Sequence, residues 1–139
     1  MDDLDLNVAP PILARLAGAA SFLAGICLLA SAAQLVVFSA GPWYYAFAAL
    51  QALFGAIAAV VGMFQFQGEA WAAIVGVIGG VFTWLLLIVW TIYLMTSGVL
   101  AVLPLMASAF CGGAGVLSAF SIPGSLRVGR ARAQLFAGR

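Results

Sequence analysis

The sequence predicts an all-α integral membrane protein, a four-transmembrane-helix up-and-down antiparallel bundle with both termini in the cytoplasm. The first observation is composition: 66% of the 139 residues are hydrophobic and only 6% are charged. An ordinary soluble domain carries about 25% charged residues, and a small one needs polar groups over most of its surface. The lipid bilayer is therefore the solvent that this composition fits.

The second observation is the spacing of the charged side chains, which lie outside two long uncharged stretches. They are Asp2, Asp3, Asp5, Arg15, Glu69, Arg127, Arg130, Arg132 and Arg139. The stretches on either side of Glu69 are each roughly 55 residues long, whereas one helix needs about 20 apolar residues to cross the hydrocarbon core. Each stretch fits two spans and a turn, so the chain crosses four times and both termini lie on one side.

The third observation is a bias in where the arginines lie. Four of the five basic residues follow Leu126, and the fifth, Arg15, stands where the first helix enters the membrane. The opposite turns, around Gly41 and Ser97, carry no charge. The positive-inside rule then places both termini in the cytoplasm and the chain in a cell inner (cytoplasmic) membrane. Arginine without lysine, together with abundant alanine and glycine, indicates a bacterial source.

We expect a single domain over 1–139. Its spans are predicted near 11–38, 44–66, 70–96 and 99–121, followed by a basic cytoplasmic tail over 125–139. Pro10 and Pro11 suit the first turn of the first helix, and Gly41 with Pro42 suits a tight turn. Pro104 fits either the first turn of the last helix or a kink in a helix that begins at Val99. The run 122–124, which contains Pro123, is predicted to end that helix.

Small residues recur at helical spacing in every predicted span. Lipid supplies little hydrophobic drive between helices, so close approach through small residues holds such bundles together. The predicted helix-packing residues are Gly18, Gly25, Gly55, Gly62, Gly76, Gly80, Thr83, Gly112 and Gly113, with Gly76 and Gly80 forming a GxxxG step. Either these residues hold one bundle together, or a second face of the third or fourth helix meets another chain.

Polar side chains within the spans are few. Gln34 and Gln51 lie at similar depth on neighbouring helices, and a side-chain amide in hydrocarbon seeks a partner. We predict that they pair with each other or bond across a subunit boundary; the alternative is a polar notch for a small ligand. Trp84 lies near mid-span, where it faces lipid, fills a gap left by glycines or lines an apolar pocket.

The charged residues near the membrane surface can each be explained in two ways. Glu69, just before the third helix, suits the positive end of that helix's dipole; the alternative is a contact with a partner or with a tail arginine. Arg127, Arg130 and Arg132 suit an interfacial helix that contacts anionic lipid headgroups. The alternative is that these arginines only hold the tail in the cytoplasm.

Several chemistries are not expected. The chain has no histidine, which is the usual general base and the common ligand for metals and haem. Cys27 and Cys111 are read as small hydrophobic residues that meet only if the first and last helices touch. Without a buried acid or base we expect no enzyme and no proton-coupled transporter. We also expect no metal or other cofactor, and the net charge of +1 suggests no nucleic-acid partner.

The expected function is therefore that of a non-enzymatic small membrane protein. It would be an accessory or scaffold subunit that packs with itself, as a homo-oligomer, or with a larger membrane complex, in contact with membrane lipids. The alternative is an oligomeric channel or carrier for a neutral or hydrophobic solute, assembled around Gln34, Gln51 and the glycine faces.

Overall fold

The computed structural model describes residues 11–38, 41–96 and 102–138, and these form four helices. They are α1 (Ile12–Phe38), α2 (Pro42–Phe66), α3 (Ala70–Thr96) and α4 (Val102–Ala137). Each is long and apolar enough to cross a membrane, so the chain has the make-up of a multi-pass membrane protein. The first three helices begin and end within two residues of the predicted spans.

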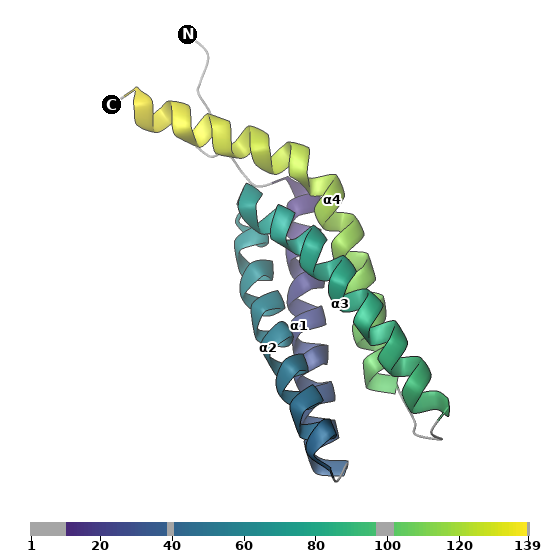
Figure 1. Ribbon diagram of the computed structural model, residues 1–139. Helices are drawn as coiled ribbons and strands as arrows, with labels where there is room; N and C mark the ends of the chain where they lie inside the picture. Colours follow the sequence, from purple (N-terminus) through teal and green to yellow (C-terminus); the bar gives the residue numbers. More distant parts are fainter. Residues whose placement is uncertain (1–10, 39–40, 97–101, 139) are drawn as a thin grey trace.

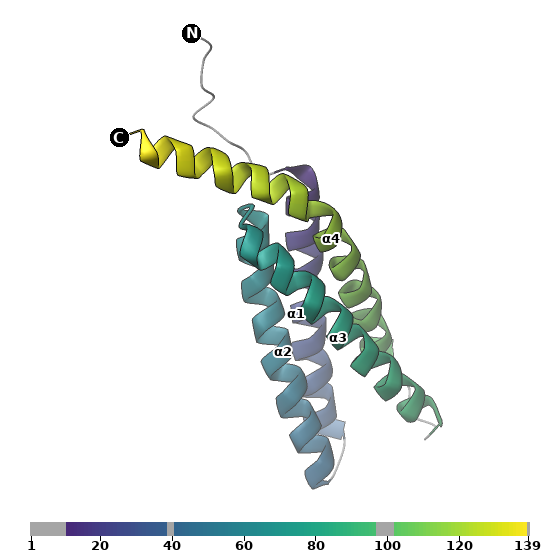
Figure 2. The same ribbon diagram turned by 45° about the horizontal axis from the view of Figure 1, so that its top comes forward.

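α1 packs most extensively with α2, and α4 packs to a similar extent with α1 and with α3. α2 and α3 touch much less, although only a short turn joins them. Figures 1 and 2 show these two helices close together at their shared turn and diverging away from it. We call the end with this turn the tail end, because α4 continues past it, and the opposite end, which holds Gly41 and Thr96, the far end.

Glycines set the distance between the paired helices. A Cβ atom added at Gly18 would lie 2.6 Å from the carbonyl oxygen of Gly62, and one at Gly25 would lie 2.6 Å from that of Gly55. A Cβ at Gly80 would lie 2.9 Å from the Cα of Gly115 on α4. Backbone therefore meets backbone between α1 and α2 and between α3 and α4.

The turn between α2 and α3 ends α2 with a left-handed glycine. Gly68 has φ 83°, its N–H bonds to the carbonyl of Gln65 (2.9 Å), and the N–H of Glu69 bonds to the carbonyl of Phe64 (3.1 Å). This pair of bonds is the Schellman motif, in which a left-handed residue satisfies the last carbonyls of a helix. The motif leaves Glu69 directly before α3.

The prediction that residues 122–124 end the last helix is wrong. α4 continues through Pro123 to Ala137, and its final part crosses the tail end of the bundle (Figure 1). A proline inside a helix removes one hydrogen bond and bends the helix, and the chain can remain helical beyond it. Ser125 and Val128, which belong to this final part, are buried. At its other end the described part of α4 begins at Val102, two residues before Pro104; the alternative of a helix that begins at Val99 falls on residues 97–101, outside the described residues.

Candidate functional site

A buried amide connects the helices at the tail end. The hydroxyl of Ser21 on α1 donates to Oε1 of Gln65 on α2 (2.7 Å), and Nε2 of Gln65 donates to Oγ of Ser118 on α4 (2.7 Å). Ser118 in turn donates to the carbonyl of Ala114 (2.6 Å). The amide is fully satisfied on both its atoms, and Gln65 is only 1% exposed.

The third helix accommodates this amide with a glycine. A Cβ atom at Gly76 on α3 would collide with the Gln65 amide and would lie 2.8 Å from Oγ of Ser118. Gln65, on α2, therefore contacts the other three helices, and we call Ser21, Gln65, Gly76 and Ser118 the polar node.

Gln65 lies at the end of the second predicted span, 44–66, and the sequence predicted no packing role for it. A signal was present, because Gln65 falls on the α2 face that carries Gly55 and Gly62, at helical spacing from both.

Towards the far end a second buried amide has no partner. Gln51 is 4% exposed, and neither its nitrogen nor its oxygen is hydrogen-bonded within the described part of the chain. The predicted bond to Gln34 is therefore not formed. The α1 face turned towards α2 at this level carries Ala32 and Leu35, which pack with Ala48, and Gln34 stands beside that face. Because Gln51 is enclosed within one chain, it is also not placed to bond across a subunit boundary.

Other buried polar groups near the far end also lack a hydrogen-bond partner among the described residues. The hydroxyls of Ser31 and Thr91 and the indole nitrogen of Trp90 are buried without a partner among the described residues. Trp90 stacks on Phe47 with ring centroids 3.9 Å apart, so an aromatic contact bridges α2 and α3 near the far end. At the tail end only Ser125 has a buried, unpartnered side chain of this kind in the described ranges.

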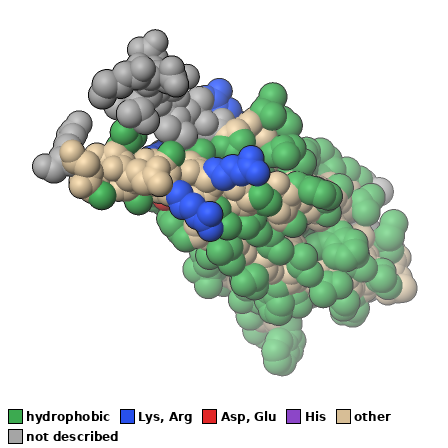
Figure 3. Space-filling view, turned by 90° about the horizontal axis from the view of Figure 1, so that it is seen from above, with side chains coloured by type: hydrophobic (Ala, Val, Ile, Leu, Met, Phe, Trp, Pro, Cys, Tyr) green, Lys and Arg blue, Asp and Glu red, His purple; other side chains and the backbone are tan. Residues whose placement is uncertain are grey.

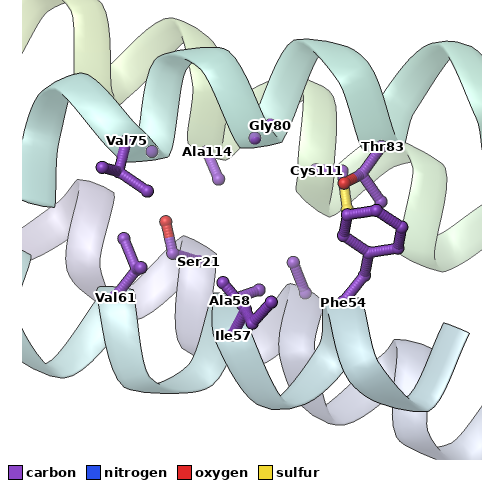
Figure 4. A pocket seen from close by; sticks show the side chains of 13 residues that line it. Ser21, Phe54, Ile57, Ala58, Val61, Val75, Gly80, Thr83, Cys111 and Ala114 are labelled. Atoms are coloured by element: carbon purple, nitrogen blue, oxygen red, sulfur yellow. The ribbon is translucent and has the colours of Figure 1, made fainter. Parts of the chain in front are cut away.

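A cavity of about 50 Å³ lies between α2 and α3, and all four helices contribute to its wall. Figure 4 shows Val61 and Val75 towards one end of the cavity and Phe54 and Thr83 towards the other. Ile57 and Val75 in the wall are 46% and 40% exposed, so the cavity reaches the outer surface where α2 and α3 diverge. Gly79 also lines it, and a Cβ atom added there would meet nothing within 4 Å.

A smaller cavity of about 10 Å³ adjoins the first. Its wall includes Gln51, Leu28 and Leu87, and it shares Phe54 and Thr83 with the larger cavity. Such a volume is close to the smallest that holds one water molecule. The unpartnered amide of Gln51 thus lines the smaller cavity, and the side chains of Phe54 and Thr83 stand in the walls of both.

Of the remaining residues that the sequence singled out, some are packed within the bundle and one is exposed. Trp84 fills the gap left by a glycine, because a Cβ atom at Gly112 would lie 3.0 Å from its indole ring, and Thr83 is buried. Gly113, by contrast, is exposed, and a Cβ atom added there would meet nothing within 4 Å.

The tail of α4 is tied to the turn between α2 and α3. Nη1 of Arg132 forms an ion pair with Glu69 (2.9 Å), and Nη2 donates to the carbonyl of Gln67 (2.9 Å). The contact between Glu69 and a tail arginine is therefore formed, and Glu69 also stands directly before α3, at the positive end of that helix's dipole. Arg127 and Arg130 are exposed, and Figure 3 shows arginine side chains on the surface of this end. Their contact with lipid headgroups stays a prediction.

The two cysteines are free, and they meet in one apolar cluster. Cys111 belongs to a buried group with Ala24, Leu28 and Leu87, and Cys27 packs against this group. Among the described residues no three histidine, cysteine or acidic side chains come together as metal ligands would.

Comparison with models of known protein families, with curated proteins and with solved structures finds no match.

Proposed function

We propose that the chain is a non-enzymatic integral protein of the cytoplasmic membrane, whose helices cross antiparallel with both termini in the cytoplasm. The distribution of charge supports this orientation: Arg15, Glu69 and the arginines of α4 all lie at the tail end among the described residues. Positive residues favour the cytoplasmic side. A cysteine placed at Gly138 should react with an impermeant maleimide from the cytoplasmic side alone; reaction only from the other side would reverse the orientation.

We propose further that the protein acts as a scaffold or accessory subunit, and that a second copy of the chain packs on α4. The observation that carries this is Gly113. Glycine within a helix costs about 1 kcal/mol relative to alanine, and at this position none of the described residues comes close enough to need it. Ala109 and Val116, one turn away on either side, are also exposed. This face therefore offers the close backbone approach that joins transmembrane helices.

Disulfide trapping tests the packing. In a chain with Cys27→Ala and Cys111→Ala, Gly113→Cys should give a covalent dimer under mild oxidation in membranes. Ala119→Cys is the matched control, because Ala119 is exposed on a different side of α4 and should stay monomeric. A Gly113→Cys chain that forms no more dimer than the control would contradict self-packing, and a covalent adduct with another protein would show a heterologous partner instead.

A channel or carrier for a neutral or hydrophobic solute is the second candidate, and the buried amide of Gln51 favours it. The expected location of the solute site differs, however, from an assembly of several subunits. Gln51 faces a cavity within one chain, so the solute site would lie inside each subunit and would not need several subunits around a pore.

A further inference from the structure

We propose that the space between α2 and α3 is a binding site for a long-chain alcohol, which enters sideways from the lipid and hydrogen-bonds to Gln51 through its hydroxyl group. The proposal develops the solute-binding candidate and does not depend on self-packing through Gly113.

The state of the Gln51 amide is the first argument. A buried polar group without a partner is costly, and native interiors leave few of them. Gln51 is only 4% exposed and lines a cavity, and neither polar atom of its side chain has a partner among the described residues. Gln65, which is as deeply buried, satisfies both of its polar atoms with serines. The chain can bond a buried amide, and at Gln51 it does not.

The chemistry of the wall defines the ligand. The described residues around the two cavities include no charged side chain, so a charged group would remain uncompensated there. The amide offers one acceptor and one donating group. A hydroxyl can donate to Oε1 and accept from Nε2 at once, whereas a carbonyl can only accept and would leave Oε1 unpaired. A neutral hydroxyl is therefore the smallest group that satisfies both atoms.

The shape of the site defines the rest of the ligand. From Gln51 to Val61 the cavities follow α2 for about 15 Å, at 1.5 Å per residue, and their walls are mainly apolar. The larger cavity holds a short stretch of hydrocarbon, and the exposed side chains of Ile57 and Val75 mark where the chain continues into lipid. Phe54 and Thr83 line both cavities, and the proposal requires the Phe54 side chain to rotate so that the hydroxyl reaches Gln51.

Photolabelling in vesicles of zwitterionic phospholipid tests the site. The probe is hexadecanol with a diazirine in its chain, and the matched probe has a methyl group in place of the hydroxyl. The alcohol probe should label peptides of α2 and α3 at least fivefold more than the matched probe. Excess unlabelled hexadecanol or geranylgeraniol should compete, and the stronger competitor shows whether a straight or an isoprenoid chain is preferred.

Three variants assign the labelling to the site. Gln51→Leu should reduce alcohol labelling to the level of the matched probe, since it removes only the hydrogen-bonding group. Gly79→Leu should reduce labelling by both probes, because the new side chain fills the cavity without a clash at its Cβ. Gly113→Leu adds the same side chain at an equally open position outside the cavity, and should leave labelling unchanged even if it abolishes self-packing.

Two results would overturn the proposal. Equal labelling of the wild-type chain by the two probes would show that no group recognises the hydroxyl, and that water alone serves Gln51. Wild-type labelling of Gln51→Leu would show that the amide takes no part. The thermal-unfolding midpoint of each variant, which should equal or exceed that of wild type for Gln51→Leu, separates loss of binding from loss of the fold.

Discussion

The two ends of the bundle treat the same residue type in opposite ways. At the tail end Gln65 bonds to Ser21 and Ser118 and fits against Gly76, so one amide connects all four helices. Towards the far end Gln51 is as deeply buried but has no partner in the described chain, and α2 and α3 diverge in the direction of this end (Figure 2). Polar groups that hold a membrane bundle together are satisfied within it, whereas unsatisfied ones beside a cavity are available to a ligand.

The largest effect is expected from a substitution that breaks the close packing of α1 against α2, on which both ends depend. Gly18→Leu should destabilise the protein by about 3 kcal/mol or more, because overpacking against backbone cannot be relieved by a side-chain rotation. The atoms in the way are the carbonyl oxygen of Gly62 and the backbone of Phe66. Ala19→Leu, on the exposed side of α1, is the control. Unfolding by denaturing detergent measures both, and equal stability would contradict the backbone contact.

The next effect concerns the polar node. Gln65→Leu should lower the free energy of unfolding by about 1–3 kcal/mol, because hydrogen bonds between membrane helices contribute about 0.6 kcal/mol on average and up to about 1.7, and two are lost. Ser21→Ala removes one of the two bonds and should cost less. If Gln65→Leu were as stable as wild type, the tail end would not owe its cohesion to this amide.

The smallest effect belongs to the ion pair between Arg132 and Glu69. Both side chains are more than a third exposed, so the pair should contribute only about 0.2–1 kcal/mol, and less at high salt. A double-mutant cycle of Arg132→Gln and Glu69→Gln measures it, with Arg130→Gln as the exposed control on the same segment. A coupling well above about 1 kcal/mol would mean that the tail of α4 is a structural clamp.

Much of the architecture could be predicted from the sequence, because hydropathy and charge spacing report how often the chain crosses a bilayer. The close approach at Gly18, Gly25, Gly55 and Gly62 followed from the same physics, since only small residues bring helix backbones together in lipid.

The candidate site could not be predicted in the same way. Depth along a helix follows from counting residues, but the pairing of Gln34 with Gln51 also needed the rotation of each helix, which tertiary packing decides. For the same reason the role of Gln65 was missed, although its helical spacing from Gly62 indicated the buried face. Pro123 was read as a stop because local geometry disfavours proline in helices; packing of Ser125 and Val128 over the tail end offsets that cost.

The most direct test of the contrast between the two ends is the free energy of unfolding of Gln51→Leu in purified protein without added alcohol. Removing an unpartnered buried amide should stabilise the protein by about 1 kcal/mol, opposite in sign to Gln65→Leu, and hexadecanol should then stabilise the wild type but not the variant. A loss of stability similar to that of Gln65→Leu would contradict the account, since it would show that Gln51 already has its partner within the fold.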